Sequence, residues 1–225
     1  MAARTAVIMP LARKVSREHR RQQLIDATMR VLARKGYAQT TLSDVAAEAG
    51  VSHGLVNFHF NTKEKLLTET LLFMAEEYRA NWVKALEHAG PTPAEQLDAL
   101  LRADYEPAIC TQVHLACWCS FWGEVQSRPI YQQECASNDG LYIDRMVSFC
   151  EALIAEGGYP IDAVRTARII RLVGEGLWLD MLSMTKPYSS GEAIATLYAC
   201  VATLFPRHFS QSGLLQAGKH LEKTS

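Results

Sequence analysis

The stretch TLSDVAAEAGVSHGLVNFHFNTK, residues 41–63, decides the fold of this chain. Its first part carries one apolar stripe at the i, i+3, i+4 and i+7 positions of a short helix: Leu42, Val45, Ala46 and Ala49. Gly50 follows where a helix end favours a left-handed residue, and Ser52 is a good N-cap for a second helix. Two short helices joined by such a turn predict a helix-turn-helix.

The second of these helices has one narrow inner stripe and a mixed outer face. Val56 and Phe60 lie four residues apart and face inward, and the residues left pointing out are His53, Leu55, Asn57 and His59. A helix that presents such a face suits the major groove of DNA. An ordinary helical hairpin is the alternative interpretation of the same pattern.

The sequence of this region resembles that of the TetR family of transcriptional repressors. The resemblance spans roughly residues 24–67, and the segments that carry it are Gly36-Tyr37, Ala49-Gly50-Val51-Ser52, Phe60 and Lys63-Glu64-Lys65-Leu66. It implies an all-α protein with an N-terminal three-helix DNA-binding domain and a C-terminal helical domain that binds a ligand and dimerises. Two copies of the chain would then read the two halves of a palindromic operator.

Side-chain chemistry and the resemblance together select the DNA contacts. Asn57 can pair with adenine, Leu55 can meet a thymine methyl group, and His53 can donate to a base or a phosphate. The resemblance implies phosphate contacts for Thr41, His59 and Lys63. It implies no base preference, because tyrosines are frequent in the family where Asn57 and His59 stand here. The expected DNA-binding residues are Thr41, Ser52, His53, Gly54, Leu55, Asn57, His59 and Lys63.

Charge is segregated along the chain, although the net charge is only −1. Residues 1–65 hold 11 Lys and Arg against 5 Asp and Glu, so the rest of the chain carries a negative balance. This asymmetry suggests that only the N-terminal part meets a polyanion. Arg17, Arg20 and Arg21 either add phosphate contacts or form a solvated helix end.

Length and composition fit a helical protein with a core. The chain has 225 residues, of which 48% are hydrophobic, and no run approaches the roughly 18 apolar residues of a membrane span. Helical periodicity without a strand signal or a repeat predicts an all-α fold of about nine helices. The predicted division is a disordered basic arm over 1–15, a helix-turn-helix domain over 16–65 with its motif at 41–60, a ligand-binding and dimerisation domain over 66–207, and a flexible tail over 208–225. A transit peptide is the alternative interpretation of the arm.

Several helix ends are marked by their own residues. Gly36 is expected to end the first helix, and Asn61 with Glu64 resembles a capping box for a long helix that follows. Thr92 with Pro93 and Glu95 is a second, cleaner helix start. That long helix would join the DNA-reading end to the C-terminal domain.

The helix expected over 162–184 is apolar nearly all round from Ile169 to Met184. Such a helix must be covered on most sides, and one chain has few elements with which to cover it. The excess of apolar surface on this helix suggests that a partner chain covers it. The resemblance implies a four-helix interface made with the helix over 191–205. Burial within the monomer is the alternative.

Aromatic residues concentrate in the C-terminal part. Trp118 and Trp122 share a helix face with Phe121 beside them, and Trp178 lies on the apolar helix one turn after Glu175. These rings could simply fill the core. A carboxylate in so apolar a helix, however, costs heavily unless it is paired or bound. Ring faces and an anion are what a quaternary ammonium needs, since it has no N–H to donate.

A second resemblance covers this region. Its segments are Trp118-Cys119-Ser120-Phe121-Trp122, Pro129 with Tyr131, Gly176-Leu177-Trp178-Leu179 and Lys186-Pro187. They are similar to the BetI branch of the TetR family, the choline-responsive repressors of glycine-betaine synthesis. The resemblance implies that choline or a relative binds here, and the expected ligand-binding residues are Tyr105, Glu106, Trp118, Phe121, Trp122, Glu175 and Trp178.

The sequence therefore predicts a cytoplasmic, homodimeric, ligand-responsive repressor of genes for glycine-betaine synthesis or uptake. A TetR-type regulator of other genes that senses a different hydrophobic or cationic molecule is the alternative. An enzyme that uses Cys117 or His114 is disfavoured, because no nucleophile, base and orienting group come together in the sequence. The six cysteines show no zinc spacing, so we expect reduced thiols, no metal and no cofactor.

Overall fold

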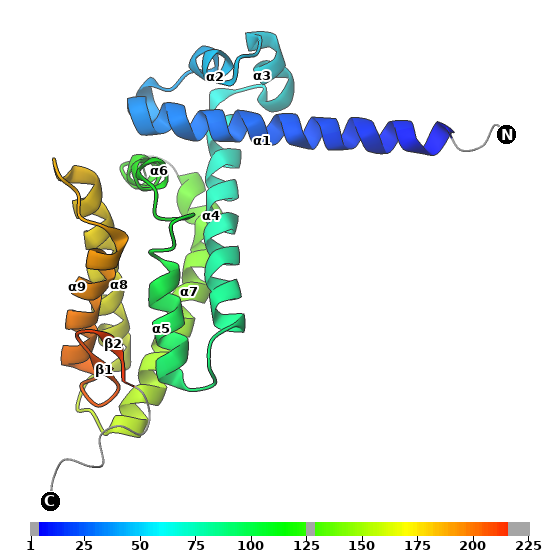
Figure 1. Ribbon diagram of the computed structural model, residues 1–225. Helices are drawn as coiled ribbons and strands as arrows, with labels where there is room; N and C mark the ends of the chain where they lie inside the picture. The colour runs from blue at the N-terminus through cyan, green and yellow to red at the C-terminus, as the bar shows by residue number, and fades with distance from the viewer. Residues whose placement is uncertain (1–4, 125–128, 216–225) are drawn as a thin grey trace, which may run out of the picture. The chain divides into compact units, whose positions relative to one another are not determined.

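The computed structural model of the protein describes residues 5–124 and 129–215 (Figure 1). Its contacts divide the chain into two compact units. Unit 1 comprises Met1–Met74 and Gln112–Glu134, and unit 2 comprises Ala75–Thr111 and Cys135–Ser225. The predicted boundary at residue 65 differs from this division, because a later helix of the chain packs with the N-terminal helices and joins unit 1.

Unit 1 is built around its first helix. Its elements are α1 (Thr5–Gln39), α2 (Leu42–Ala49), α3 (His53–Phe60), the first half of α4 (Lys63–Glu87) and α6 (Gln112–Trp122). α1 packs against both α2 and α6. The most deeply buried side chains of this core include Leu24, Ile25, Leu32, Val45, Val56, Phe60, Leu66 and Leu67. The apolar stripes expected from the sequence are therefore the ones that meet here.

The helix-turn-helix prediction is confirmed by its helix ends. Thr41 caps α2 in a capping box with Asp44, whose N–H donates to the Thr41 hydroxyl at 3.1 Å. Gly50 ends α2 in the left-handed region, with φ 65°. Ser52 then caps α3, accepting the N–H of Leu55 at 3.3 Å.

Two helix limits in unit 1 differ from the prediction. α1 begins at Thr5, so residues 5–15, expected to be disordered, are helical backbone that continues the same helix, and residues 1–4 lie outside the described residues. No glycine occurs between Thr5 and Lys35 to stop it, and Gly36, at φ 76°, breaks the helix where expected. The cap of α4 is Thr62, whose hydroxyl accepts the N–H of Lys65 at 3.1 Å. Asn61 instead ends α3 with φ 61°, so the prediction that it caps α4 was wrong.

Unit 2 contains the second half of α4 together with α5 (Pro93–Ala103), α7 (Pro129–Gly157) from Cys135 onward, α8 (Ala163–Ser183) and α9 (Ser190–Leu204). The predicted capping box at the start of α5 is present, with Thr92 and Glu95 bonded reciprocally. The buried side chains of this core include Leu97, Leu100, Leu101, Cys150, Leu153, Ile170, Leu197, Val201 and Phe205.

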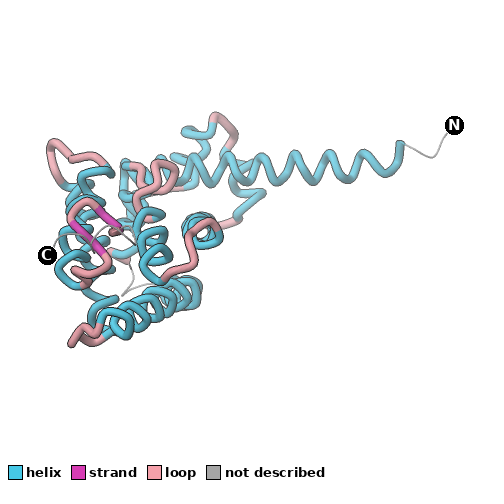
Figure 2. Tube along the Cα trace, turned by 60° about the horizontal axis from the view of Figure 1, so that its bottom comes forward, coloured by secondary structure: helices cyan, strands magenta, loops and turns pink. Residues whose placement is uncertain are grey.

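Residues 208–215, expected to belong to a flexible tail, include a short β-hairpin after α9. β1 (Phe209–Ser210) pairs antiparallel with β2 (Gly213–Leu214), the magenta hairpin of Figure 2. Phe209 is buried and its ring stacks on Tyr198 of α9, which fixes the hairpin to the helix. Strands of two residues are too short to leave a periodic signal in the sequence. Residues 216–225 lie outside the described residues.

The described residues contain no helix that is both long and apolar enough to span a membrane. They also contain no group of three or more His, Cys, Asp or Glu side chains placed to hold a metal ion. All six cysteines are free thiols, and burial raises the pKa of Cys117 and of Cys150 to about 12. Both thiols therefore stay protonated at neutral pH.

Candidate functional site

The outer face of α3 is the first functional surface. Val56 and Phe60 are fully buried and fix the helix to unit 1. The residues exposed on the opposite side are His53, Gly54, Asn57 and Phe58, and Leu55 and His59 are half-buried. The predicted outward residues thus reach the surface to different degrees, and an unpredicted residue joins them.

Phe58 is that residue, with 68% of its side chain exposed. It stands two positions from Val56 and two from Phe60, and two helical steps turn a side chain by about 200°. Phe58 therefore points away from the buried face, and its ring meets that of His59 edge-on at 5.4 Å. Phe58 is not among the outward residues predicted from the sequence, although helical spacing was a signal that could have placed it outside.

Ion pairs join α1 to α2, the helix that precedes α3 in the helix-turn-helix. Glu48 of α2 pairs with Arg30 at 2.8 Å and with Arg34 at 3.2 Å, and Lys35 pairs with Asp44 at 2.6 Å. These pairs lower the pKa values of Glu48 and Asp44, chiefly through direct hydrogen bonds. All are exposed, so each adds little to stability, but together they set the position of α2.

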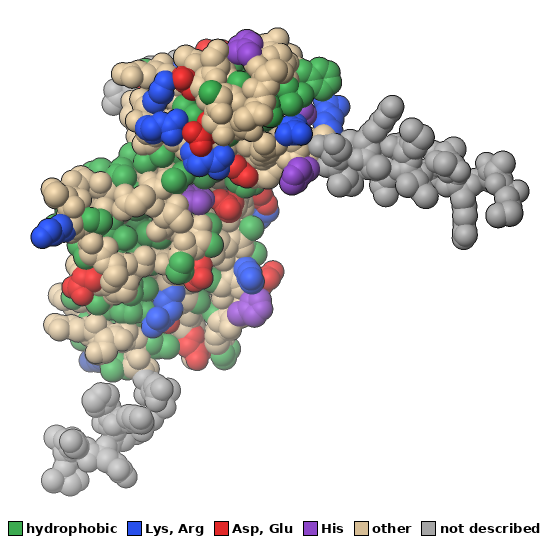
Figure 3. All heavy atoms as spheres, turned by 45° about the horizontal axis from the view of Figure 1, so that its top comes forward, with side chains coloured by type: hydrophobic (Ala, Val, Ile, Leu, Met, Phe, Trp, Pro, Cys, Tyr) green, Lys and Arg blue, Asp and Glu red, His purple; other side chains and the backbone are tan. Residues whose placement is uncertain are grey.

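A basic group lies near the end of α3. Burial lowers the pKa of His59, and the positive charges of Arg17, Arg20 and Arg21 lower it further. His59 is therefore a neutral donor at neutral pH, beside three permanent cations. Arg21 is held by Glu69 at 2.7 Å. Figure 3 shows Lys and Arg side chains on the part of unit 1 next to the grey N-terminal segment.

Lys63 occupies the start of α4, and its ammonium group donates to the Ala38 carbonyl at 2.8 Å. The same ammonium lies 5.7 Å from the centre of the Tyr37 ring, which in turn contacts Phe121 of α6 edge-on at 5.9 Å. The structure thus gives Lys63 a role in joining α4 to the end of α1. Its predicted phosphate contact stays a prediction.

The second functional feature lies in unit 2 and is centred on Asp104, which follows α5. Only 9% of Asp104 is exposed. One carboxylate oxygen accepts the hydroxyl of Tyr78 at 2.8 Å, and the other accepts that of Tyr142 at 2.6 Å. Within the described part of the chain, no Lys, Arg or His side chain pairs with this carboxylate.

Aromatic rings surround this carboxylate. The ring centre of Tyr78 lies 5.7 Å from that of Tyr142 and 5.9 Å from that of Trp178, and Trp82 meets Tyr142 at 6.0 Å. The Trp178 indole N–H donates to the Asp104 carbonyl at 3.2 Å. We call these five residues the Asp104 cluster: Tyr78, Trp82, Asp104, Tyr142 and Trp178.

Burial dominates the electrostatics of this cluster. It raises the pKa of Asp104 to about 7, against the lowering effect of the two tyrosine hydroxyls, and the charge of Glu175 raises it further. Burial also raises the pKa values of Tyr78 and Tyr142 well above their ordinary range, so both stay neutral donors. The cluster therefore concentrates one negative charge, or one proton, among ring faces.

The predicted ligand residues fall into both units. Trp118, Phe121 and Trp122 belong to unit 1, where the two indoles stack at 6.3 Å. Unit 2 contains the others: Tyr105, Glu106, Glu175 and Trp178. Tyr105 is buried and donates to the Gly174 carbonyl at 3.2 Å, Glu175 pairs with Arg171 at 2.5 Å, and Glu106 is exposed. One cage made of all seven stays a prediction.

Sequence reasoning missed four members of the Asp104 cluster. The residues that the sequence predicts for the ligand site do not include Tyr78, Trp82, Asp104 or Tyr142. A partial signal was present, because Asp104 directly precedes the predicted pair Tyr105-Glu106. Nothing local connects these positions with Trp178, more than seventy residues later.

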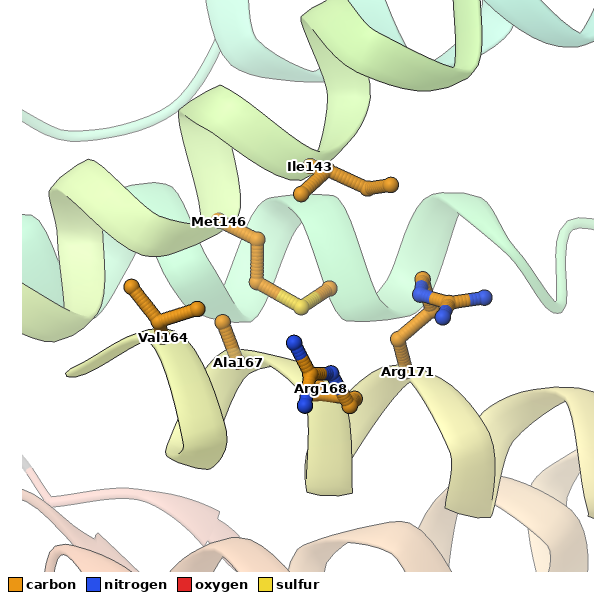
Figure 4. Close-up of a pocket in the computed structure, with 6 residues that line it drawn as sticks. All are labelled: Ile143, Met146, Val164, Ala167, Arg168 and Arg171. Atoms are coloured by element: carbon orange, nitrogen blue, oxygen red, sulfur yellow. The ribbon is translucent and has the colours of Figure 1, made fainter. Parts of the chain in front are cut away.

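Unit 2 also has a groove of about 220 Å³ between α7 and α8, shown in Figure 4. Its lining consists of Ile143, Met146, Val164, Ala167, Arg168 and Arg171. Four apolar side chains form one part of the lining and two arginine side chains the other. The groove therefore has a positive character, in contrast to the Asp104 cluster.

The compact helix-turn-helix of unit 1, with its exposed α3 and adjacent arginines, defines a DNA-binding regulator of the helix-turn-helix class. Residues 24–70 match the family described as "Bacterial regulatory proteins, tetR family", and residues 93–206 match "BetI-type transcriptional repressor, C-terminal". The chain belongs to the TetR family and carries a BetI-type C-terminal domain. It is a transcriptional repressor by family and not an enzyme.

Similar proteins include two regulators named "HTH-type transcriptional regulator BetI". The one from Agrobacterium fabrum is 31% identical, over 78% of this chain and 83% of its own length. The one from Burkholderia thailandensis is 28% identical, over 79% of this chain and 89% of its own length.

Solved structures show the same fold. A transcriptional regulator from Pseudomonas aeruginosa PAO1 is 27% identical with a TM-score of 0.72, covering 86% of this chain and 95% of its own. A transcriptional regulator from Saccharomonospora viridis in complex with choline is 19% identical with a TM-score of 0.70, covering 82% and 96%. At that identity the second likeness shows the fold alone.

Proposed function

We propose that this chain is a homodimeric repressor whose affinity for its operator falls when choline or a related quaternary ammonium binds. The genes it controls would serve glycine-betaine synthesis or uptake, and it would act in the cytoplasm with its DNA. The observation that carries this proposal is the BetI-type match over residues 93–206, the part of the chain in which TetR proteins bind their effectors. The choline complex of the Saccharomonospora regulator supports the same effector class.

The DNA contacts proposed for α3 follow from exposure and chemistry. Asn57 is exposed and can pair with adenine, and half-buried Leu55 can meet a thymine methyl group from the side. Phe58 offers only apolar contact, so it suits a thymine methyl group at the centre of the contact. The expected backbone contacts come from Thr41, Ser52, His53, Gly54, His59 and Lys63.

Dimerisation is proposed through α8 and α9. Ile169, Leu172 and Leu179 of α8 are 46%, 52% and 55% exposed, a row of aliphatic side chains on one helix face. α9 adds small exposed residues, Ala195 and Ala199, which permit close approach of a second helix. A charge within this row, Leu179→Glu, should give monomers in sedimentation, while Leu141→Glu, equally exposed on α7, should leave the dimer intact. A monomeric wild-type protein would overturn this interface.

The effector is proposed to act by shifting populations. A ligand lowers operator affinity only if it prefers a conformer that fits DNA poorly, and only by its differential affinity for the two conformers. α4 is the element suited to carry the change, because it holds Lys63 at one end and both Tyr78 and Trp82 further along. A helix of 25 residues transmits displacement as a rigid rod more readily than a loop does.

Fluorescence anisotropy of the DNA upstream of the chain's own gene tests this function. The labelled fragment should bind the full-length protein, and millimolar choline chloride should release it. Sodium chloride at equal ionic strength is the control, because salt alone weakens DNA binding. Release by both salts to the same extent would contradict choline sensing while leaving DNA binding intact.

A further inference from the structure

We propose that the Asp104 cluster is the cation site: the Asp104 carboxylate, held by two tyrosine hydroxyls, supplies the counter-charge for a quaternary ammonium between the rings of Tyr78, Tyr142 and Trp178. The inference rests on the proposed function, because it names where the effector binds. It assigns the charge to Asp104 in place of the Glu106 or Glu175 expected from the sequence.

The Asp104 carboxylate carries a charge that no described side chain compensates. A buried carboxylate costs free energy unless a cation or a proton neutralises it. The hydroxyls of Tyr78 and Tyr142 satisfy its hydrogen bonding but bring no charge. Asp98, on the same α5, shows the ordinary arrangement, since it also accepts a tyrosine hydroxyl, from Tyr198, but pairs with Arg102 at 2.8 Å. Asp104 is thus a carboxylate built for a positive charge that described side chains do not supply.

The Asp104 cluster suits a quaternary ammonium better than a primary ammonium. A primary ammonium needs hydrogen-bond acceptors for three N–H groups, whereas each Asp104 oxygen already accepts one hydroxyl and keeps only about one further lone-pair site. A quaternary ammonium has no N–H, so it needs only charge and ring faces. The three nearby rings, of Tyr78, Tyr142 and Trp178, offer those faces. The chemistry therefore favours trimethylammonium compounds over amines with free N–H groups.

The aromatic rings of the Asp104 cluster contact one another. Tyr78 lies 5.7 Å from Tyr142 and 5.9 Å from Trp178 between ring centres, which is direct contact. A trimethylammonium group must part them to reach the carboxylate. Because these rings come from α4, α7 and α8, ligand entry moves the packing of those helices. Binding and conformational change are then one event.

The other features considered are less suited to a cation. The groove between α7 and α8 contains Arg168 and Arg171, which repel positive charge. In unit 1, Trp118 and Trp122 stack on each other at 26° between ring planes, so each turns a face toward the other. Neither arrangement joins aromatic rings to a buried anion.

Proton exchange gives the site a separate signature. The titratable groups around Asp104 are the hydroxyls of Tyr78, Tyr105 and Tyr142, the Cys110 thiol and the Glu175 carboxylate. Glu175 is itself paired with Arg171 and interacts with Asp139 of α7. With a pKa of about 7, Asp104 is partly protonated at neutral pH, so an arriving cation displaces a proton. Cation affinity should therefore rise with pH and level off above pH 8.

Titration calorimetry of the full-length protein with choline chloride tests the site. Asp104→Asn keeps the size and shape of the side chain but removes the charge, and one tyrosine hydroxyl must turn to accept from the new amide NH2. Choline affinity should fall by at least about tenfold. Asp98→Asn is the matched control, since it is the same change on the same helix beside a tyrosine, and its affinity should match wild type. Repeating the wild-type titration at pH 6.5 in two buffers of different ionisation enthalpy should reveal proton release that Asp104→Asn lacks.

The outcomes separate the two proposals. Equal choline affinity in wild type and a folded Asp104→Asn overturns the site and leaves the effector intact. If Asp104→Asn does not fold stably, the wild-type titrations in the two buffers test the site instead. Absence of buffer-dependent proton release from the wild type would then overturn the site. If the wild type binds tetramethylammonium through Asp104 but not choline, the site stands and the choline effector falls. Binding of neither cation overturns both.

Discussion

The outer face of α3 and the Asp104 cluster place similar side chains in opposite surroundings. On α3, Phe58 and Asn57 face solvent, and Phe58 is 68% exposed although its ring contacts His59 edge-on. Around Asp104, aromatic rings enclose a buried carboxylate and bond its oxygens. A large exposed ring indicates a surface that awaits a macromolecule, and a buried unpaired charge indicates a site that awaits a small ion. Changes to the two regions should therefore affect different measurements.

The largest effect on DNA is expected from Asn57→Ala. Loss of a bidentate contact to adenine should weaken specific operator binding by about 1–3 kcal/mol. Non-specific binding to random duplex, which depends on phosphates, should hardly change. Choline affinity should be unaffected, because Asn57 lies in unit 1 and the Asp104 cluster in unit 2. Anisotropy with both DNAs measures this, and equal weakening of both would show that Asn57 does not read a base.

The matching change in the other region concerns stability. Between the ordinary pKa of Asp near 3.8 and the raised value of about 7, the folded protein holds a proton on Asp104 that the unfolded chain has released. Raising the pH through this window therefore lowers the free energy of unfolding, on the order of 4 kcal/mol for this group.

Urea unfolding at pH 5 and pH 8 measures this change in the free energy of unfolding. The contribution of Asp104 is the difference between the change in the wild type and the change in Asp104→Asn. The variant has no carboxyl at this position, so it should lose less stability at pH 8, and Asp98→Asn should behave as wild type. Identical pH dependence in all three proteins would mean that Asp104 is ionised and paired in the folded state.

A smaller effect is expected from Phe58. If its ring meets a thymine methyl group, replacing one thymine in each half-site by deoxyuridine should cost the wild type about 1 kcal/mol. Phe58→Ala should already have lost that contact, so it should bind both DNAs alike. Because Phe58 is mostly exposed, the variant should melt at the wild-type temperature. Equal sensitivity to deoxyuridine in both proteins would remove Phe58 from the reading surface.

The two regions also differ in how far the sequence predicts them. The helix-turn-helix is local: Thr41 and Ser52 cap the helices, Gly50 makes the turn, and spacing within about twenty residues fixes the buried stripe. Phe58 is the exposed α3 residue that the sequence prediction left out, although the same helical spacing places it outside.

No local sequence pattern predicts the Asp104 cluster. Its members come from α4, the end of α5, α7 and α8, and only tertiary packing brings them together. The sequence predicts aromatic rings and a carboxylate for the ligand site, with Trp178 among them, and this stays a prediction. It chose Glu175 for the charge because an acid on an apolar helix is conspicuous, yet Glu175 is half-exposed and paired with Arg171.

The most direct test follows choline-driven release of DNA by Asp104→Asn. Without choline, this variant and Asp98→Asn should bind the labelled upstream fragment as tightly as the wild type. On addition of choline, the wild type and Asp98→Asn should release the DNA while Asp104→Asn remains bound. Release of the DNA from Asp104→Asn at the wild-type choline concentration would contradict the account.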